Sequence, residues 1–318
     1  MRHLLELLPG EHLGSAVGRI HTFGVNGTFN KTTSALGLGT HNIRPHRLCH
    51  ADDIILDTLF RTRGASQPLK DNAFGHYIGT FLTQNERSQL EAALSRSEVI
   101  QLRIAGQSCI QQQYWRWCAD CVEEDQAMYG VPFYHRDHQI PGVFHCSKHK
   151  LGLSGHCPEC DFNASSVSAL TMPPHDNTCP HCHSWMAGYE GHFTEAMEEV
   201  ERVSLRMANT SHCASFSDLT DAVRMAMCLS LEDMGTLKGT KLVSKWFNEL
   251  EHRADPMAVA AYFTNMKMDE EDMRFPPQLR NTRLYHDRAK RDPLHPLAHL
   301  LTLQQAGYDL AVVMGFEG

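Results

Sequence analysis

Eight side chains that could bind a soft metal ion lie in four pairs within residues 118–182. Each pair has two residues between its members; the pairs are Cys118/Cys121, Cys146/His149, Cys157/Cys160 and Cys179/Cys182. Two such turns complete the tetrahedral shell that Zn²⁺ prefers. The spacing therefore predicts two Zn²⁺ ions per chain. Four protein ligands leave no open position for water, so we expect both ions to be structural and not catalytic.

Sequential pairing is the simplest assignment of these ligands. It places Cys118, Cys121, Cys146 and His149 on one ion and the other four cysteines on the second. The second set has 18 residues between its pairs, within the usual zinc-ribbon spacing, whereas the first has 24. Interleaved pairing remains open. Four neighbouring histidines could also replace a ligand, namely His145, His156, His181 and His183.

Disulfides are the alternative use of these cysteines. The chain shows no secretory signal, and its other cysteines follow no such pattern, so zinc is favoured over disulfides. We expect these other cysteines to be buried apolar side chains; they are Cys49, Cys109, Cys213 and Cys228.

A catalytic alternative is the His-Arg-Asp-His run at residues 135–138, which a metallohydrolase could use with Glu123 or Asp125 as the base. Residues 129–144 alternate apolar and polar side chains between Gly-Pro turns, which predicts an extended segment. In a strand, His135 and Asp137 would face away from their two neighbours, so the four would not converge on one metal. We therefore expect this run to link the two zinc units or to contact a partner protein.

Three aromatic residues precede the first ligand, at Tyr114, Trp115 and Trp117. A small zinc unit has little core of its own, so such residues usually form its hydrophobic cover. If they are exposed, they would instead be anchors of an interface.

Charge limits the possible partners. The chain has 318 residues, is 42% hydrophobic and has a net charge of −8. Residues 1–117 carry 12 Lys/Arg against 9 Asp/Glu, whereas residues 118–318 carry 17 against 28. A general polyanion binder is therefore excluded, and any nucleic-acid contact needs local basic surface. No apolar run reaches the length of a membrane span, so we expect a soluble, cytoplasmic protein.

Two regions could supply such basic surface, one near the amino terminus and one between residues 274 and 291. Both could equally be solvated faces. The candidate nucleic-acid or partner contacts are Arg19, Lys31, Arg44, Arg47, Arg280, Arg283, Arg288, Lys290 and Arg291.

Helical periodicity dominates the rest of the chain. Near the amino terminus we expect a first helix from the helical spacing of Leu13, Val17, Ile20 and His21, which stops around residues 24–27. Further helices are expected over 30–36, 51–61 and 85–94, the last capped by Thr83. Several short helices separated by glycine turns are compatible with a helix-turn-helix reader of DNA. Beyond the zinc region we expect helices over 194–207, 217–231, 240–253, 256–265 and 296–305, with an acidic hinge at 269–272.

The predicted fold is mainly α, with small zinc-ribbon β elements. We expect an N-terminal helical domain of helix-turn-helix type over residues 1–110, a tandem zinc-binding ribbon or knuckle domain over 111–190, and a C-terminal helical domain over 191–318.

The central motifs, taken in order, resemble the signature of the TniQ/TnsD transposition proteins. Resemblance is strong over residues 100–185 and weaker over 10–95. The matching motifs are Cys118-Ala-Asp-Cys121-Val-Glu-Glu-Asp125, Tyr129-Gly130, Phe133-Tyr134-His135-Arg136-Asp137-His138-Gln139-Ile140-Pro141-Gly142-Val143, Cys146-Ser-Lys-His149, Gly10-Glu11-His12-Leu13, Arg19-Ile20-His21, and Phe74 to Leu94.

The resemblance implies a non-catalytic adaptor that chooses the insertion site of a TnsABC-type transposon. Such proteins read a chromosomal DNA site or attach to an RNA-guided, Cascade-like CRISPR effector complex, and then recruit the AAA+ ATPase TnsC. Some act as head-to-tail homodimers. This chain lacks the long C-terminal extension of the larger TnsD proteins, which favours the guided mode. The alternatives are a DNA-binding protein that reads a fixed site itself, a transcriptional regulator, and a zinc-dependent hydrolase.

Overall fold

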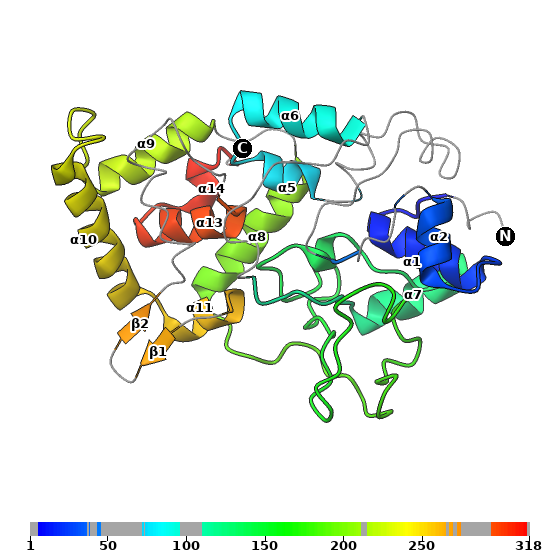
Figure 1. The fold of residues 1–318 in the computed structure, drawn as a ribbon. Coiled ribbons are helices and arrows are strands. Elements are labelled where there is room, and N and C mark those ends of the chain that lie inside the picture. The colour runs from blue at the N-terminus through cyan, green and yellow to red at the C-terminus, as the bar shows by residue number, and fades with distance from the viewer. Residues whose placement is uncertain are drawn as a thin grey trace. The chain divides into compact units, whose positions relative to one another are not determined.

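The computed structural model describes residues 6–36, 38, 43–45, 72, 74–95, 110–210, 215–264, 267–269, 272–274 and 294–316. Within these ranges the protein is mainly helical and has little strand (Figure 1). No helix among the described residues is both long and apolar enough to span a membrane.

The chain divides into two compact units. The first draws on Met1–Gly75, Leu90–Ile100 and Gln112–Gly191, and the second on His76–Gln89, Gln101–Gln111 and His192–Gly318. These units join segments that lie on both sides of the expected domain boundaries, and the division into three domains stays a prediction.

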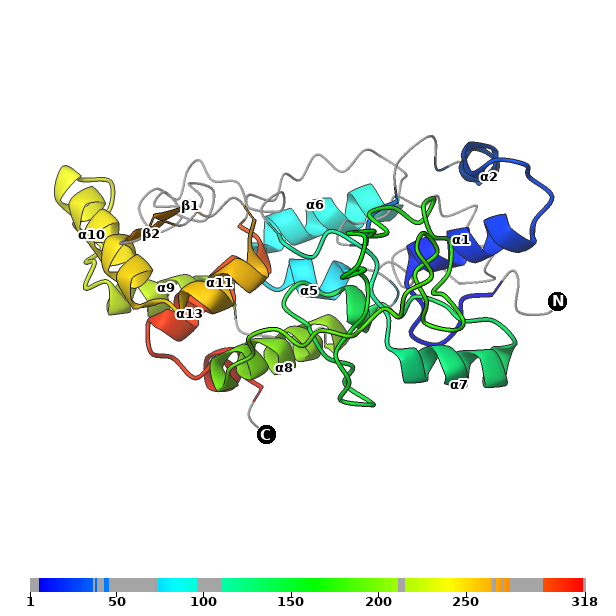
Figure 2. The same cartoon turned by 90° about the horizontal axis from the view of Figure 1, so that it is seen from below.

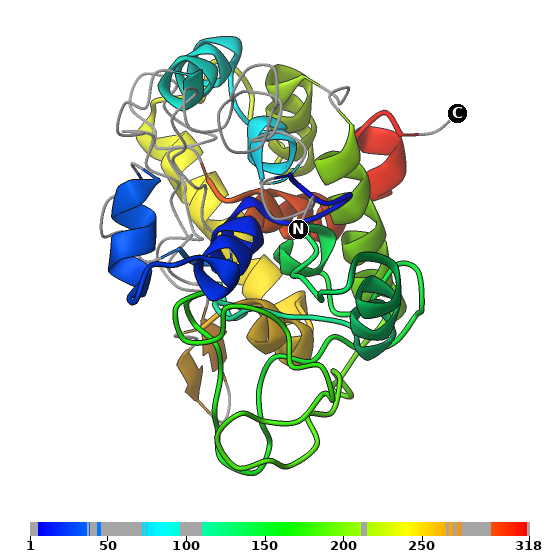
Figure 3. The same cartoon turned by 90° about the vertical axis from the view of Figure 1, so that its right-hand side faces the viewer.

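In the first unit, the helices are α1 (Leu13–Phe23), α2 (Phe29–Ala35) and α7 (Ala119–Tyr129), with a short 3₁₀ helix, η3 (Asp137–Gln139). The side chain of His12 caps α1, and that of Thr28 caps α2. The apolar positions that predicted α1, Leu13, Val17 and Ile20, are all buried. Residues 140–190 form neither helix nor named strand but a series of linked turns (Figure 3).

The second unit is built around α13 (Pro296–Gln305), most of whose side chains are buried. This helix packs against α8 (Glu195–Asn209), α9 (Phe216–Ala226) and α14 (Leu310–Val313) (Figures 1 and 2). Glu199 lies on α8 and joins it to α13 and α14. Its carboxylate accepts hydrogen bonds from the Gln304 side chain and from the Leu310 amide. The second unit also contains α10 (Leu237–Arg253) and α11 (Pro256–Tyr262), whereas α5 (Gly75–Gly79) and α6 (Gln84–Ser95) each include residues assigned to both units.

Most predicted helices that fall on described residues are confirmed, and α13 has the predicted bounds. Thr83 caps α6 as expected, and its amide and hydroxyl exchange hydrogen bonds with Glu86 in a capping box. The expected helix over 51–61 lies outside the described residues.

The prediction of an acidic hinge at 269–272 is wrong for its two end residues, Asp269 and Asp272, which lie in paired strands. The antiparallel strands β1 (Lys267–Asp269) and β2 (Asp272–Arg274) pair there, with Asp269 opposite Asp272. Three-residue strands are too short to produce a recognisable alternation in the sequence.

A glycine allows α1 to lie close to the turns between the Cys157/Cys160 and Cys179/Cys182 pairs. A Cβ atom on Gly18 would lie well inside van der Waals contact of the Thr171 carbonyl oxygen and close to the Val167 side chain. One turn later, the Thr22 hydroxyl donates a hydrogen bond to the Thr171 hydroxyl at 2.8 Å. Gly18 is therefore needed for this close approach of helix and turn.

We expect Gly18→Ala to lower the free energy of unfolding by about 1–3 kcal/mol, because the methyl group must displace packed backbone. At an exposed helix position the same change would stabilise by about 1 kcal/mol, so the sign is informative. Urea denaturation followed by tryptophan fluorescence measures the effect. Gly27→Ala, whose Cβ would meet nothing within 4 Å, is the matched control. Equal midpoints for the two variants would contradict the close packing.

Candidate metal centres

The eight predicted ligands gather into two groups in the structure. Cys118, Cys121, Cys146 and His149 form the first group, and Cys157, Cys160, Cys179 and Cys182 form the second. Within each group the candidate ligand atoms all lie within 4.8 Å of one another. This grouping corresponds to sequential pairing. Each group could hold a metal ion.

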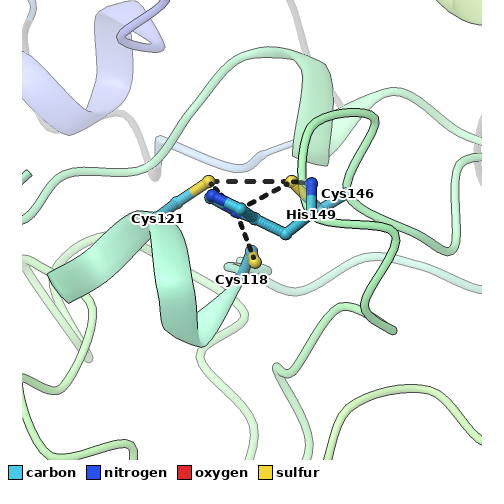
Figure 4. A group of neighbouring side chains, drawn as sticks. All are labelled: Cys118, Cys121, Cys146 and His149. Atoms are coloured by element: carbon cyan, nitrogen blue, oxygen red, sulfur yellow. Dashed lines mark hydrogen bonds between the residues drawn. The ribbon is translucent and has the colours of Figure 1, made fainter. Parts of the chain in front are cut away.

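The first group has the spacing of a tetrahedral site. The His149 Nδ1 atom lies 3.4 Å from the sulfurs of Cys118 and Cys121 and 3.7 Å from that of Cys146 (Figure 4). The Cys121 and Cys146 sulfurs are 3.6 Å apart. Zinc bonds of ordinary length at tetrahedral angles would separate sulfur from nitrogen by about 3.6 Å and sulfur from sulfur by about 3.8 Å. The donor set and these distances therefore fit Zn²⁺.

Helix α7 supplies half of the first group. Cys118 is its N-cap residue and Cys121 lies in its first turn. Residues three apart lie on the same helix face, so the start of the helix directs both sulfurs to one side. The helix ends at Gly130, whose φ of 76° is the left-handed conformation common at helix C-termini.

The other three pairs share one turn conformation. In each turn, the backbone carbonyl of the first cysteine accepts a hydrogen bond from the amide four residues later. The backbone amide of the same cysteine donates to the carbonyl five residues later. The fourth residue after the cysteine has a left-handed φ of 55–62° in all three cases. These bonds join Cys146 with Lys150 and Leu151, Cys157 with Asp161 and Phe162, and Cys179 with His183 and Ser184, at 2.8–3.0 Å.

Two of these turns form the second group. Its sulfurs are 3.5 Å apart for Cys157 and Cys182 and 3.7 Å apart for Cys160 and Cys179. Cys157 and Cys179 are buried, whereas the second cysteine of each turn is half-buried. Burial raises the pKa of Cys160 to about 12, whereas hydrogen bonds from Ser184 lower the pKa of Cys182 to about 6.

In the first group, too, hydrogen bonds between neighbouring thiols shift their pKa values in opposite directions. Hydrogen bonds with Cys118 and Cys146 raise the pKa of Cys121 well above its usual range, whereas those from Cys118 and Cys121 hold the pKa of Cys146 far below it. Thiolates this close repel one another, so full deprotonation requires a cation at their centre.

An outer carboxylate supports the first group. Glu124, on α7, lies 3.2 Å from Nε2 of His149, while Nδ1 of the same ring faces the sulfurs. Glu124 also pairs with Lys148, and the hydrogen bonds from Lys148 and His149 lower its pKa. Such a carboxylate fixes the ring orientation of a metal-bound histidine. This role of Glu124 is not among the predictions from the sequence, although an acid three residues after Cys121 on a helix is a usable signal.

The expectation of a strand at residues 135–138 is wrong. The segment enters the 3₁₀ helix η3, and the rings of His135 and His138 lie 5.0 Å apart, not on opposite faces. His135 pairs with Asp125 of α7 at 2.9 Å, and buried His138 lies 4.0 Å from the Cys121 sulfur. These contacts are structural supports of the first group. Residues 134–136, at the start of this segment, pair with a distant part of the chain.

That distant segment is Gly10–Glu11–His12. The His12 amide donates to the Tyr134 carbonyl and the Arg136 amide donates to the Gly10 carbonyl, both at 2.8 Å, around a bridge between Glu11 and His135. The start of the chain is thus joined by backbone hydrogen bonds to the metal-binding region.

Arg19 is not a surface contact. Its guanidinium forms two hydrogen bonds to the Glu11 carboxylate, at 2.8 and 3.1 Å, and both side chains are buried. The assignment of Arg19 to a nucleic-acid surface is therefore corrected to a core ion pair. Lys31 is exposed and Arg44 is half-buried. The other basic candidates, Arg47, Arg280, Arg283, Arg288, Lys290 and Arg291, lie outside the described residues.

Buried tryptophans lie next to the first group and contact residues near the second. Trp117 pairs with Ser154 through the backbone, and its indole N–H donates to the Asn177 side chain at 2.7 Å. Asn177 lies two residues before Cys179 and also donates to the Met186 carbonyl. Trp115 is fully buried, so both tryptophans are cover and not exposed anchors. Nothing in the sequence singled out Asn177, because its partner is 60 residues away.

The remaining candidates lie outside both groups. His145, His156, His181 and His183 belong to neither group of ligand atoms. Cys228 is exposed, which corrects the expectation that it is buried. Cys49, Cys109 and Cys213 lie outside the described residues.

We expect Cys157→Ser to reduce the metal content from two ions per chain to one and to destabilise the turns around residues 155–190, because a closed shell loses a thiolate. Elemental analysis of purified protein and circular dichroism measure the two effects. Cys228→Ser is the control, since that thiol is exposed and outside both groups. A Cys157→Ser protein that retained two ions would contradict the assignment.

Glu124→Gln should weaken metal binding at the first group by about 10- to 100-fold, because the His149 ring loses its carboxylate partner. Titration of Co²⁺ against a chelator measures this change, since the absorption bands of Cys₃His and Cys₄ sites differ. Glu123→Gln changes an exposed acid on the same helix and should leave the affinity unaltered. Equal affinities for the two variants would rule out the outer-sphere role of Glu124.

Comparison with known proteins gives one family. Residues 4–153 match the family model of TniQ, a range that includes α1, α2, α7 and the whole first metal group. No curated protein matches this chain. The match confirms the family resemblance expected from the motifs. Residues 4–153, just under half of the chain, are therefore a TniQ-family region.

Proposed function

We propose that this protein is a non-catalytic adaptor that selects target sites for DNA transposition. It links an RNA-guided CRISPR effector complex, or target DNA, to an AAA+ ATPase of the TnsC kind. The observation that carries the proposal is the TniQ match over residues 4–153, because TniQ domains belong to proteins of transposition target selection.

Both metal groups hold Zn²⁺ in a structural role. Support comes from the Cys₃His and Cys₄ donor sets, from sulfur–nitrogen and sulfur–sulfur distances near those of a tetrahedral site, and from the burial of most ligands. Bound Zn²⁺ would supply cross-links and not chemistry. The chain's own residues then hold the ligands in place, with Glu124 orienting His149 and His138 lying beside Cys121.

The finer elements of the fold are part of the same proposal. The turn pairs of the second group support a zinc-ribbon arrangement, and α1 and α2, which contact each other, support a helix-turn-helix type of N-terminal region. If α1 and α2 read DNA directly, the chain would choose a fixed site by itself, as a TnsD-like protein or a regulator would.

The guided mode is preferred because the chain has a net charge of −8, and because Arg19, one of the basic residues expected at a DNA surface, is buried in an ion pair. Phosphate neutralisation needs Lys and Arg gathered on one surface. A zinc hydrolase is disfavoured, since His135 is engaged with Asp125 and His138 is buried next to a candidate ligand.

Two binding measurements test the proposal. The tagged protein should co-purify with a CRISPR effector complex and with an AAA+ ATPase of the TnsC kind, and should bind free duplex DNA weakly across a salt series. Tight, salt-dependent binding to one duplex without the effector complex would replace the guided mode by direct site reading. Failure to bind the ATPase in either setting would contradict the adaptor role.

A further inference from the structure

Trp185 is the exposed member of the chain's four tryptophans. Its side chain is 62% exposed, whereas Trp115, Trp117 and Trp246 are 0%, 1% and 8% exposed. It follows the second turn of the Cys₄ group, three residues after Cys182. An exposed tryptophan contributes little to folding and is enriched where proteins bind partners.

A carboxylate is held on the same face as this indole. Trp185 pairs with Thr178 in an antiparallel bridge, and directly opposed residues of such a pair place their side chains on one face. The Thr178 hydroxyl donates to Asp176 Oδ1 at 2.7 Å, and the Thr178 amide donates to the same oxygen at 3.1 Å. These bonds hold the exposed Asp176 carboxylate beside the bridge and lower its pKa, so it stays ionised.

The charge of the surrounding segment limits what can bind there. Residues 151–191 contain no lysine or arginine, and their four acids, Glu159, Asp161, Asp176 and Glu190, are all exposed. With a divalent ion bound, the four thiolates of the second group would add two net negative charges. Base stacking on Trp185 would bring nucleic-acid phosphates to a segment that has no lysine or arginine to neutralise them.

We propose that Trp185 and Asp176 form a binding site for an arginine side chain of a partner protein. A guanidinium can stack on the indole face and pair with the carboxylate through two parallel hydrogen bonds. Lysine offers a compact, strongly hydrated charge without this planar fork, so the site should prefer arginine. That the partner is the AAA+ ATPase rests on the proposed function, whereas the arginine preference does not.

The arginine preference is tested with fluorescein-labelled hexaarginine and hexalysine peptides, followed by anisotropy with the full chain. We expect hexaarginine to bind at least about fivefold more tightly than hexalysine. Trp185→Ala and Asp176→Asn should each remove this difference. Asp176→Asn keeps the side-chain oxygen to which Thr178 donates. Trp185→Phe keeps an aromatic face and should retain part of the difference in affinity between the two peptides. Glu159→Gln removes an exposed acid of the same segment and should retain the full difference.

Equal binding of the two peptides to the wild type, or an unchanged preference in Trp185→Ala, would overturn the arginine site. So would a loss of duplex DNA binding in Trp185→Ala without any change in peptide binding, because it would indicate base stacking instead. Unchanged metal content and circular dichroism establish that each variant is folded.

The AAA+ ATPase is the second probe. Trp185→Ala should weaken its binding about tenfold, and Glu159→Gln should not. If the wild type fails to bind the ATPase, the proposed function fails while the peptide result still decides the arginine site. If the wild type binds the ATPase and Trp185→Ala binds equally well, the site is not the ATPase contact.

Discussion

Closure of the first metal group is the constraint on which the first unit depends. Residues 140–190 form no helix and no named strand, so they lack the hydrogen-bond ladders that stabilise most folded segments. The ligand residues join α7 to the turn at Cys146 and His149, and α7 in turn holds His135 through Asp125. Because residues 134–136 pair with residues 10–12, a metal ion that closed this group would also position residues 10–12 and, with them, α1.

The parts of this architecture that could be predicted are those encoded over a few residues. Ligand spacing is local, so the four pairs and their sequential grouping could be inferred without knowing the fold. Helical periodicity and caps are local too: Thr83 and Glu86 mark the start of α6, and Pro296 marks that of α13. The family signature adds the order of these local motifs and covers the first group but not the second.

What could not be predicted depends on partners far away in the sequence. Arginine is usually a surface residue, and only the fold brings Arg19 against buried Glu11. Residues 135–138 alternate like a strand, yet after the bridge between His135 and Glu11 the chain turns into the 3₁₀ helix Asp137–Gln139, and Asp125 pairs with His135. Asn177 carries no ligand signal, and its role appears only because Trp117 reaches it across 60 residues.

The turns at Cys146, Cys157 and Cys179 share one backbone conformation but differ in their exposed side chains. Their backbone hydrogen bonds and left-handed residue are the same, but the first turn exposes Lys148 and has Glu124 as a partner, whereas the other two lie in a segment without lysine or arginine. In a helix or strand, exposed residues must also satisfy a backbone preference. Where metal ligands and main-chain bonds fix the turn, the exposed positions are free to differ. The turns at Cys157 and Cys179 can therefore carry a partner-binding surface that the turn at Cys146 does not share.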